Sequence, residues 1–375
     1  MSFFEEIYEK GIYFIFNNRI DLFAQFSICL GEGFQKLGVP IFGNRNYWLT
    51  SLEPQEYLFS YTPDVASVDC SLRVIDISQC SPEQAQSMIK KEFLESKNIP
   101  IIVVDQSDSD IDIPAFQDAS HVFCSHMTHL RQYPSHFIPW CFGISDRIEK
   151  ATAHSRPFSM REKKALVNFR PSHNQSIRLA MEFILVPWLD KYFSIDREVD
   201  SPLDEPSKIQ DDVFHYLNWY QLQSRHNPRY YKRLKEAMIC CAYGGNFLYL
   251  GNYYMYMGTQ PGVVRWDSWR FWESLAAGCV TIHLDFQTYG FQMPIMPVKW
   301  EHYVGLDLKN CKDAVERLND EPSLMEKISV QGKEWALKHY TPLPTACYFL
   351  DAITGEPYGT TEYLLSLISS EIEAV

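Results

Sequence analysis

The chain has 375 residues, of which 46% are apolar and 15% aromatic, and its formal net charge is −13. This length exceeds what a single hydrophobic core usually serves, so about two domains are expected. The acidic balance argues against a non-specific nucleic-acid binder, because such proteins need a basic surface to displace counterions.

The cysteines and the N-terminus bear on where the protein resides. Ten cysteines are scattered without a Cys-x-x-Cys pair, and several lie in apolar runs, where a free cysteine behaves as a small hydrophobe. The N-terminus, MSFFEEIYEKG, lacks the basic and apolar regions of a secretory signal, and no apolar run is long enough to span a membrane. We therefore expect a cytoplasmic protein without a transmembrane segment; peripheral attachment at a membrane surface stays open.

The first half of the chain alternates short apolar strands with helices. The pattern predicts strands over 11–16 and 39–42, with a helix over 21–37 that ends at Gly38. A strand over 72–77, a helix over 82–96 and strands over 99–105, 121–125 and 137–142 follow. Because strand–helix–strand order is typical of parallel sheets, residues 1–150 are expected to form a Rossmann-like domain.

A second α/β unit is predicted after a polar linker. Residues 145–163 lack apolar periodicity, and a strand over 165–169, a polar turn and a helix from about Gln175 follow. This arrangement can place Arg170 and Arg178 at an anion-binding rim; the alternative is that Arg178 is a solvated helix residue. Tyr243, Gly244 and the next glycine form a loop where backbone can approach a ligand closely.

The most informative stretch is RWDSWRFWESLAAGCVTIHLD, residues 265–285. Apolar residues at three- and four-residue spacing predict a helix that Gly278 ends in the left-handed conformation, and a buried strand follows. Asp267 or Ser268 can cap this helix, and Arg270 can offer a fork of donors to phosphate. Glu273, one turn in, can accept hydrogen bonds from ribose or sugar hydroxyls. Since a helix N-terminus favours anions, the pattern fits a nucleotide-linked ligand; a solvated amphipathic helix is the alternative.

The motif Ser-x-Arg-Phe-x-Glu-x-Leu-Ala-x-Gly-Cys-Val, residues 268–280, resembles the donor-site helix of GT-B-fold glycosyltransferases, especially exostosin-like enzymes and related bacterial sugar transferases. The segments PVKWEHY at 297–303 and GKEW at 332–335 extend the resemblance, which covers about Lys163 to Tyr340. It implies an α/β fold of two Rossmann-like domains facing across a cleft. It also implies a nucleotide-sugar-binding domain over 151–340, an acceptor-side domain over 1–150, and a segment over 341–375 that returns to the N-terminal domain.

One position departs from the family pattern. Many retaining members carry another glutamate eight positions before the motif glutamate, and this chain has Arg265 there. The departure favours an inverting mechanism, which requires a base on the acceptor side to activate the hydroxyl. Asp21, Asp105 and Asp108 are the candidates in the N-terminal half.

Two clusters contain residue types that can bind metal ions. His121, Cys124, His126 and His129 have spacings that can suit zinc, but the first two would point to opposite faces of a strand. The acidic run from Asp105 to Asp112 lacks the glycine and terminal glutamate of a calcium loop. No metal site is therefore predicted.

These features predict an enzyme that transfers a sugar from a nucleoside-diphosphate sugar to a hydroxyl of a glycan, lipid-linked or protein acceptor. The nucleotide sugar is a substrate, and no cofactor and no nucleic-acid partner are expected. Two alternatives stay open: a non-catalytic sugar- or nucleotide-binding protein on the same scaffold, and a GT-B-shaped sugar epimerase.

Overall fold

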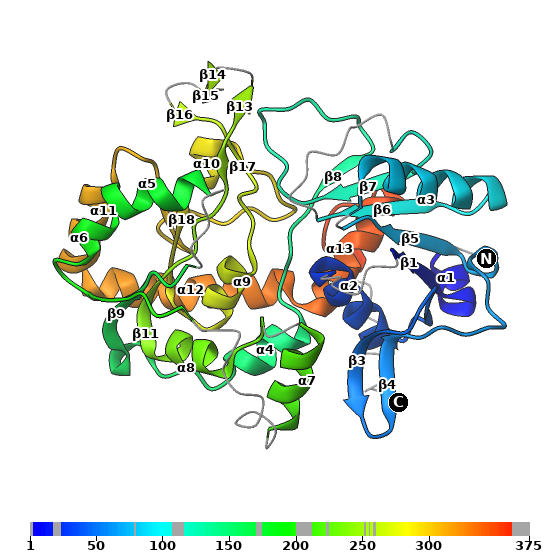
Figure 1. Cartoon of the computed structure of the whole chain (residues 1–375), viewed down its shortest axis with the longest axis horizontal. Helices are drawn as coiled ribbons and strands as arrows, with labels where there is room; N and C mark the ends of the chain where they lie inside the picture. The colour runs from blue at the N-terminus through cyan, green and yellow to red at the C-terminus, as the bar shows by residue number, and fades with distance from the viewer. Residues whose placement is uncertain are drawn as a thin grey trace. The chain divides into compact units, whose positions relative to one another are not determined.

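The computed structural model describes residues 3–17, 24–78, 80–106, 116–169, 175–199, 212–222, 225–250, 253–254, 256–257 and 260–361. They fall into two compact units (Figure 1). Unit 1 contains residues 1–125, 133–146 and 340–375, and unit 2 contains residues 126–132 and 147–339. We keep the boundaries expected from the sequence, after residues 150 and 340, as a proposal about independent folding domains.

Unit 1 is built on a six-stranded parallel sheet in the order β2-β1-β5-β6-β7-β8. Its central strands are buried throughout, as expected when helices cover both faces of a parallel sheet. The strands are β1 (Ile12–Phe16), β2 (Ile41–Gly43), β5 (Leu72–Asp76), β6 (Ile101–Asp105), β7 (His121–Cys124) and β8 (Phe137–Pro139).

Four helices accompany this sheet, namely α1 (Phe3–Lys10), α2 (Gln25–Lys36), α3 (Pro82–Glu95) and α13 (Pro342–Thr354). Helix α3 begins with a capping box, in which Ser81 and Gln84 satisfy each other's backbone N–H groups. An antiparallel hairpin, β3 (Tyr47–Leu52) and β4 (Gln55–Phe59), was not predicted from the sequence.

Unit 2 is built on a five-stranded parallel sheet in the order β10-β9-β11-β18-β19. Its strands are β9 (Glu162–Leu166), β10 (Ser194–Asp196), β11 (Ala237–Cys241), β18 (Val280–Leu284) and β19 (Val304–Leu306). Three short antiparallel pairs lie outside this sheet: β12 (Asn246–Phe247) with β17 (Val263–Val264), β13 (Tyr249–Leu250) with β14 (Tyr253–Tyr254), and β15 (Tyr256–Met257) with β16 (Gln260–Pro261).

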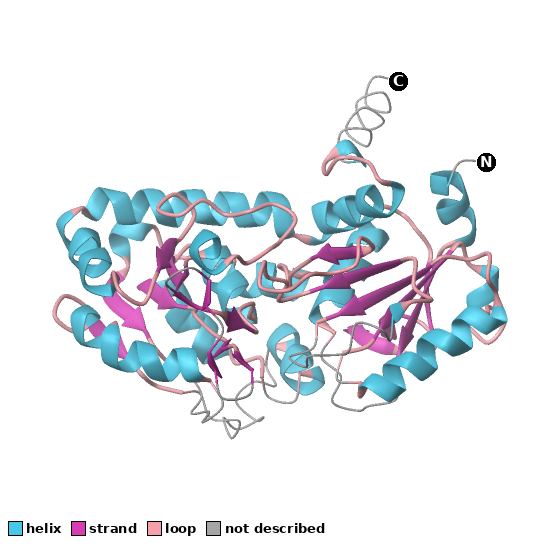
Figure 2. Ribbon diagram, turned by 90° about the horizontal axis from the view of Figure 1, so that it is seen from above, coloured by secondary structure: helices cyan, strands magenta, loops and turns pink. Residues whose placement is uncertain are grey.

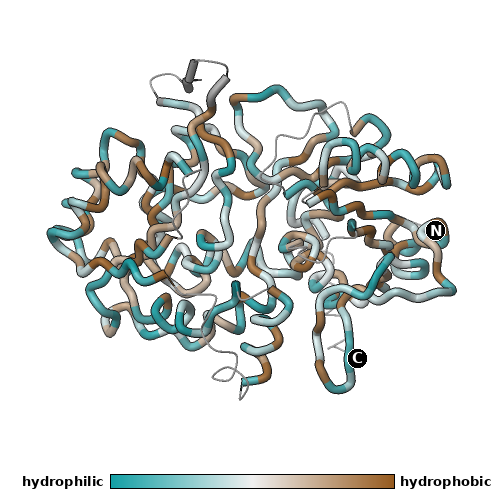
Figure 3. Tube along the Cα trace, viewed as in Figure 1, coloured by the Kyte–Doolittle hydropathy of each residue, from teal (hydrophilic) through white to brown (hydrophobic). Residues whose placement is uncertain are grey.

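The helices assigned mainly to unit 2 are α4 (Asp146–Thr152), α5 (Ser176–Ile184), α6 (Val186–Leu189), α7 (Val213–Gln221), α8 (Pro228–Glu236), α9 (Trp269–Ala276), α10 (Phe286–Tyr289), α11 (Cys311–Asp320) and α12 (Pro322–Tyr340). Figure 2 shows helices on both faces of the strands in each unit, and Figure 3 shows apolar segments along the central strands. Across the described residues, no helix combines the length and apolar character needed to cross a bilayer.

Two sequence expectations are corrected. The segment 145–163 is not an unstructured linker, because α4 lies within it and buries Ile148 and Ala151. The strand expected over 165–169 is β9, which begins three residues earlier with charged side chains. Glu162 and Lys163 are exposed at the start of that strand, so apolar composition locates only its buried end.

Candidate functional site

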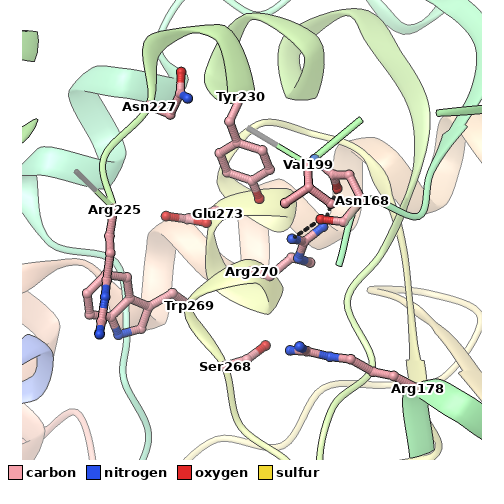
Figure 4. Close-up of a pocket in the computed structure, with 10 residues that line it drawn as sticks. All are labelled: Asn168, Arg178, Val199, Arg225, Asn227, Tyr230, Ser268, Trp269, Arg270 and Glu273. Carbon is pink, nitrogen blue, oxygen red and sulfur yellow. Dashed lines mark hydrogen bonds between the residues drawn. The ribbon is translucent and has the colours of Figure 1, made fainter. Parts of the chain in front are cut away.

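A pocket with a cavity volume of about 280 Å³ lies beyond the carboxyl ends of β9 and β10 in unit 2 (Figure 4). The chain leaves β9 toward β10 on one side and later returns to β11 on the other, so the strand order reverses beside β9. Ligands of open α/β sheets bind at such a switch point. The lining residues are Asn168, Arg178, Val199, Arg225, Asn227, Tyr230, Ser268, Trp269, Arg270 and Glu273.

First turns of three helices contribute to the pocket. Arg178 belongs to the first turn of α5, Tyr230 to that of α8, and Arg270 to that of α9. Each helix start carries a partial positive charge, and three of the ten lining residues are arginines against one glutamate. In a chain with a net charge of −13, this pocket is a local cationic site suited to an anion.

Helix α9 has the limits expected from its sequence. Asp267 Oδ1 accepts hydrogen bonds from the Ser268 N–H and from Trp272 Nε1, which fixes the chain where the helix begins. In the described structure, the side chain of Ser268 caps no helix N–H. Gly278 ends the helix with φ of 70°, and the N–H groups of Gly278 and Cys279 donate to Leu275 and Ser274. This is a Schellman motif, so the predicted helix stop is confirmed.

Arg270 is held by its surroundings. Its Nη1 donates to the side-chain oxygen of Asn168, and its Nη2 donates to the Asn168 carbonyl at 2.9 Å. Its guanidinium also lies 4.6 Å from the Phe169 ring centre and 5.5 Å from that of Tyr230. Arg270 therefore ties the end of β9 to the start of α9 at the pocket wall.

Arg178 contacts the same aromatic ring. Its guanidinium carbon lies 4.5 Å from the centre of Phe169, and Figure 4 shows the guanidinium pointing toward the hydroxyl of Ser268. One ring thus holds two cations at the pocket, an arrangement whose mutual repulsion an anionic ligand would relieve.

Glu273 lines the pocket although only 7% of the residue is exposed. Its Oε1 accepts a hydrogen bond of 2.5 Å from the Tyr231 hydroxyl and lies 3.7 Å from Nη1 of Arg147. Both partners are buried. The carboxylate is therefore charge-compensated and held in place before any ligand arrives.

Three other predicted donor residues are placed differently or fall outside the described residues. Tyr243 is 1% exposed and packs against Phe169 at 4.9 Å between ring centres; neither it nor Gly244 lines the pocket. Gly245 next to them has φ of 95°, and a Cβ there would meet the Val264 carbonyl at 2.4 Å, so close packing requires this glycine. Arg170 lies outside the described residues. Donor contact by Tyr243, Gly244 and Arg170 stays a prediction.

Of the three candidate bases, Asp105 alone is among the described residues, and Asp21 and Asp108 are not. Asp105 ends β6 and is 7% exposed, with the Cys124 sulfur 3.9 Å from its Oδ2. Its assignment as a base stays a prediction. No group of three or more His, Cys, Asp or Glu side chains is arranged to hold a metal ion within the described ranges.

Sequence reasoning missed several lining residues. Asn227 carried a usable signal, because an asparagine before Pro228 is typical of a helix start, and its side chain does cap α8. Asn168, Arg225 and Tyr230 gave no local signal. They come from separate segments that only the sheet topology brings together.

Comparisons with known proteins bear on the fold. No protein-family model and no curated protein matches the sequence. Among solved structures, an alpha-glucosyltransferase in complex with UDP-glucose and DNA containing an abasic site is similar, with 11% identity, a TM-score of 0.52, and 92% of this chain and 99% of that chain covered. Anabaena HepE in complex with UDP and glucose is similar with 8% identity, a TM-score of 0.50 and the same coverage. The chain therefore has the fold of GT-B glycosyltransferases, with two Rossmann-like α/β units.

Proposed function

We propose that the protein is a glycosyltransferase that moves a sugar from a nucleoside-diphosphate sugar to an acceptor hydroxyl. One observation carries the proposal: at the switch point of a parallel sheet, three helix starts, two arginines stacked on Phe169 and a pre-held glutamate line one pocket. The helix starts and Arg178 suit a diphosphate, and Glu273 suits hydroxyl groups of ribose or sugar.

The chemistry that this pocket can supply is stabilisation of the leaving group. Departure of the nucleoside diphosphate develops negative charge, and cationic groups fixed in advance stabilise such charge without reorganisation. We assign this role to Arg178 and to the start of α9, which both line the pocket. We propose that the transfer is inverting, on the ground that Arg265 occupies the position where retaining relatives of this motif carry a glutamate. We also propose that it is metal-independent, because the sequence carries no recognisable metal-binding motif.

We propose UDP as the nucleotide of the donor, because the alpha-glucosyltransferase and HepE complexes contain UDP or UDP-glucose. The motif at 268–280 supports the exostosin-like or related bacterial branch of the fold. For the acceptor we propose a glycan, lipid-linked or protein hydroxyl. One neighbour was solved with DNA, so DNA belongs in the acceptor panel, although the net charge of −13 argues against it. A cytoplasmic location is part of this proposal.

The test is a thermal-shift screen followed by a turnover assay. UDP, GDP, ADP and CMP are added at millimolar concentration, and a ligand that binds only the folded state raises the melting temperature. We expect UDP to act, and EDTA to make no difference. Slow hydrolysis of UDP-sugars would separate an enzyme from a binding protein, and conversion to an epimeric sugar would favour an epimerase. No stabilisation by any nucleotide would overturn the proposal.

A further inference from the structure

A buried arginine, Arg147, contacts two residues of the pocket, Trp269 and Glu273, but does not itself line the pocket. Arg147 is the first residue of unit 2 after the chain leaves unit 1 at Asp146, and it is 3% exposed. Its Nη1 donates a 2.5 Å hydrogen bond to the Tyr231 hydroxyl and lies 3.3 Å from Nδ1 of His226. Its guanidinium lies 5.3 Å from the ring centre of Trp269, a pocket residue. A buried cation needs such compensation, because desolvation makes an uncompensated charge costly.

The hydrogen-bond chain has a defined direction. Arginine can only donate, so His226 Nδ1 must accept and its proton must lie on Nε2. That Nε2 lies 2.8 Å from Nδ1 of His215 and donates to it, which leaves the His215 proton on Nε2, 3.9 Å from Asp212. Burial lowers the pKa of both histidines, in agreement with two neutral rings.

The other branch of the chain leads to the pocket. The Tyr231 hydroxyl accepts from Arg147, so its single proton is directed to Oε1 of Glu273. Burial raises the pKa of Tyr231 well above its ordinary value, so this hydroxyl keeps its proton. One oxygen of Glu273 is thus committed, and the orientation of the carboxylate is set by residues that do not line the pocket.

We propose that Arg147 and Tyr231 are positioning residues that fix the Glu273 carboxylate to accept a hydrogen bond from a ribose hydroxyl of the nucleotide. This inference rests on the proposed function. His226 Nδ1 accepts from the same Nη1 of Arg147 that donates to Tyr231, while its neighbours Arg225 and Asn227 line the pocket. The same buried chain therefore supports a second part of the pocket wall.

The experiment uses nucleotide affinity, measured by calorimetric titration with UDP and with 2′,3′-dideoxy-UDP, which lacks the ribose hydroxyls. Tyr231→Phe removes only the bridging hydroxyl. We expect it to weaken UDP binding about tenfold or more, as loss of a well-aimed hydrogen bond to a charged acceptor would, and to change dideoxy-UDP binding less than about twofold. Glu273→Gln should show the same selectivity, and the double variant should be no worse than the worse single variant.

Tyr289→Phe is the matched control, because Tyr289 is also buried in unit 2 and its hydroxyl accepts a backbone N–H from Leu308 at 3.3 Å, but it does not line this pocket. It should bind both nucleotides like the wild type. If Tyr231→Phe folds poorly, Arg147→Lys, which keeps the charge but not the planar fork, serves as the second variant with the same expected selectivity.

The outcomes separate the two proposals. Wild-type UDP affinity in Tyr231→Phe, with a loss in Glu273→Gln, would overturn this inference and leave the proposed function standing. If Tyr231→Phe lost affinity equally for UDP and for dideoxy-UDP, the hydrogen-bond network would have only a structural role, and the inference would also be overturned. A wild-type protein that binds no nucleoside diphosphate would overturn the proposed function, and this inference with it.

Discussion

At the scale of single residues, Arg270 and Arg178 make different contacts at the pocket. Arg270 donates twice to Asn168, whereas Arg178 stacks on Phe169 and points toward Ser268 (Figure 4). Two donors of the Arg270 guanidinium are therefore already bonded to Asn168, one to its side-chain oxygen and one to its carbonyl. We propose Arg178, whose guanidinium lies over Phe169 and which belongs to the first turn of α5, for the diphosphate contact; Arg270 lies in the better-matched motif.

We predict that Arg178→Ala weakens UDP binding about tenfold or more with little change in melting temperature, because it removes a charge-assisted contact to phosphate. Arg270→Lys should instead lower the free energy of unfolding by about 1–2 kcal/mol, since lysine cannot replace both hydrogen bonds to Asn168. Titration and thermal melting of the same variants test both statements. Arg197→Ala, at an exposed ion pair with Glu182, is the control. Unchanged UDP affinity in Arg178→Ala would refute its role.

His283 on β18 should make stability pH-dependent. Its two ring nitrogens lie 3.0 Å from the carbonyl oxygens of Trp266 and Leu284, and burial lowers its pKa to about 4. As the pH falls, this histidine therefore takes up its proton in the unfolded chain before it does so in the folded protein. The contribution of neutral His283 to the free energy of unfolding is complete above about pH 6.5 and is lost as the pH falls toward 4. The loss should approach about 3 kcal/mol. Urea unfolding between pH 8 and 4.5 should give a shallower pH dependence for His283→Asn; parallel curves would contradict the assignment.

At the scale of elements, the turn from α9 to β18 is set by Gly278. Its φ of 70° disfavours any other residue, and a Cβ there would lie 3.2 Å from Nη2 of Arg161. Arg161 donates to the carbonyl of Ala277, the C-cap of α9. The end of α9 thus depends on both backbone conformation and this arginine.

Gly278→Ala should reduce the free energy of unfolding by about 1–2 kcal/mol, the cost of forcing a left-handed conformation on a residue with a Cβ. Gly38→Ala is a matched control, because Gly38 has φ of 73° and nothing within 4 Å of a built Cβ. Chemical denaturation of both variants isolates the crowding against Arg161 as the difference between them. An equal loss of unfolding free energy in the two variants would show that the Arg161 side chain moves aside without a measurable energetic penalty.

At the scale of the whole molecule, α13, the last helix among the described residues, packs on α2 within unit 1. Gly33 of α2 permits this approach, since a Cβ there would lie 2.1 Å from the Pro342 carbonyl and 2.7 Å from Cβ of Ala346. Among the described residues, those that line the pocket all belong to unit 2. Packing in unit 1 and nucleotide binding can therefore be altered separately.

Gly33→Ala should destabilise the protein by about 1–3 kcal/mol, because it overpacks a close contact between two helices. UDP affinity of the folded protein should stay at the wild-type value. Calorimetric unfolding and UDP titration measure the two quantities, with exposed Gln35→Ala on the same helix as the near-neutral control. A tenfold loss of UDP affinity in folded Gly33→Ala would show that the nucleotide site extends beyond unit 2.

The sequence by itself determined the features that depend on neighbouring residues: the α/β alternation, the helix and buried strand of 269–284, and the stop at Gly278. Apolar periodicity and glycine conformation depend on a few neighbouring residues, so both can be recognised in the sequence. Only the tertiary structure brought Asn168 to Arg270 and Arg147 and Tyr231 to Glu273, because these contacts join residues from 42 to 126 positions apart. The order of strands in the sheet determines which distant residues come into contact. In this sheet β11 lies beside β9, although β10 comes between them in the chain.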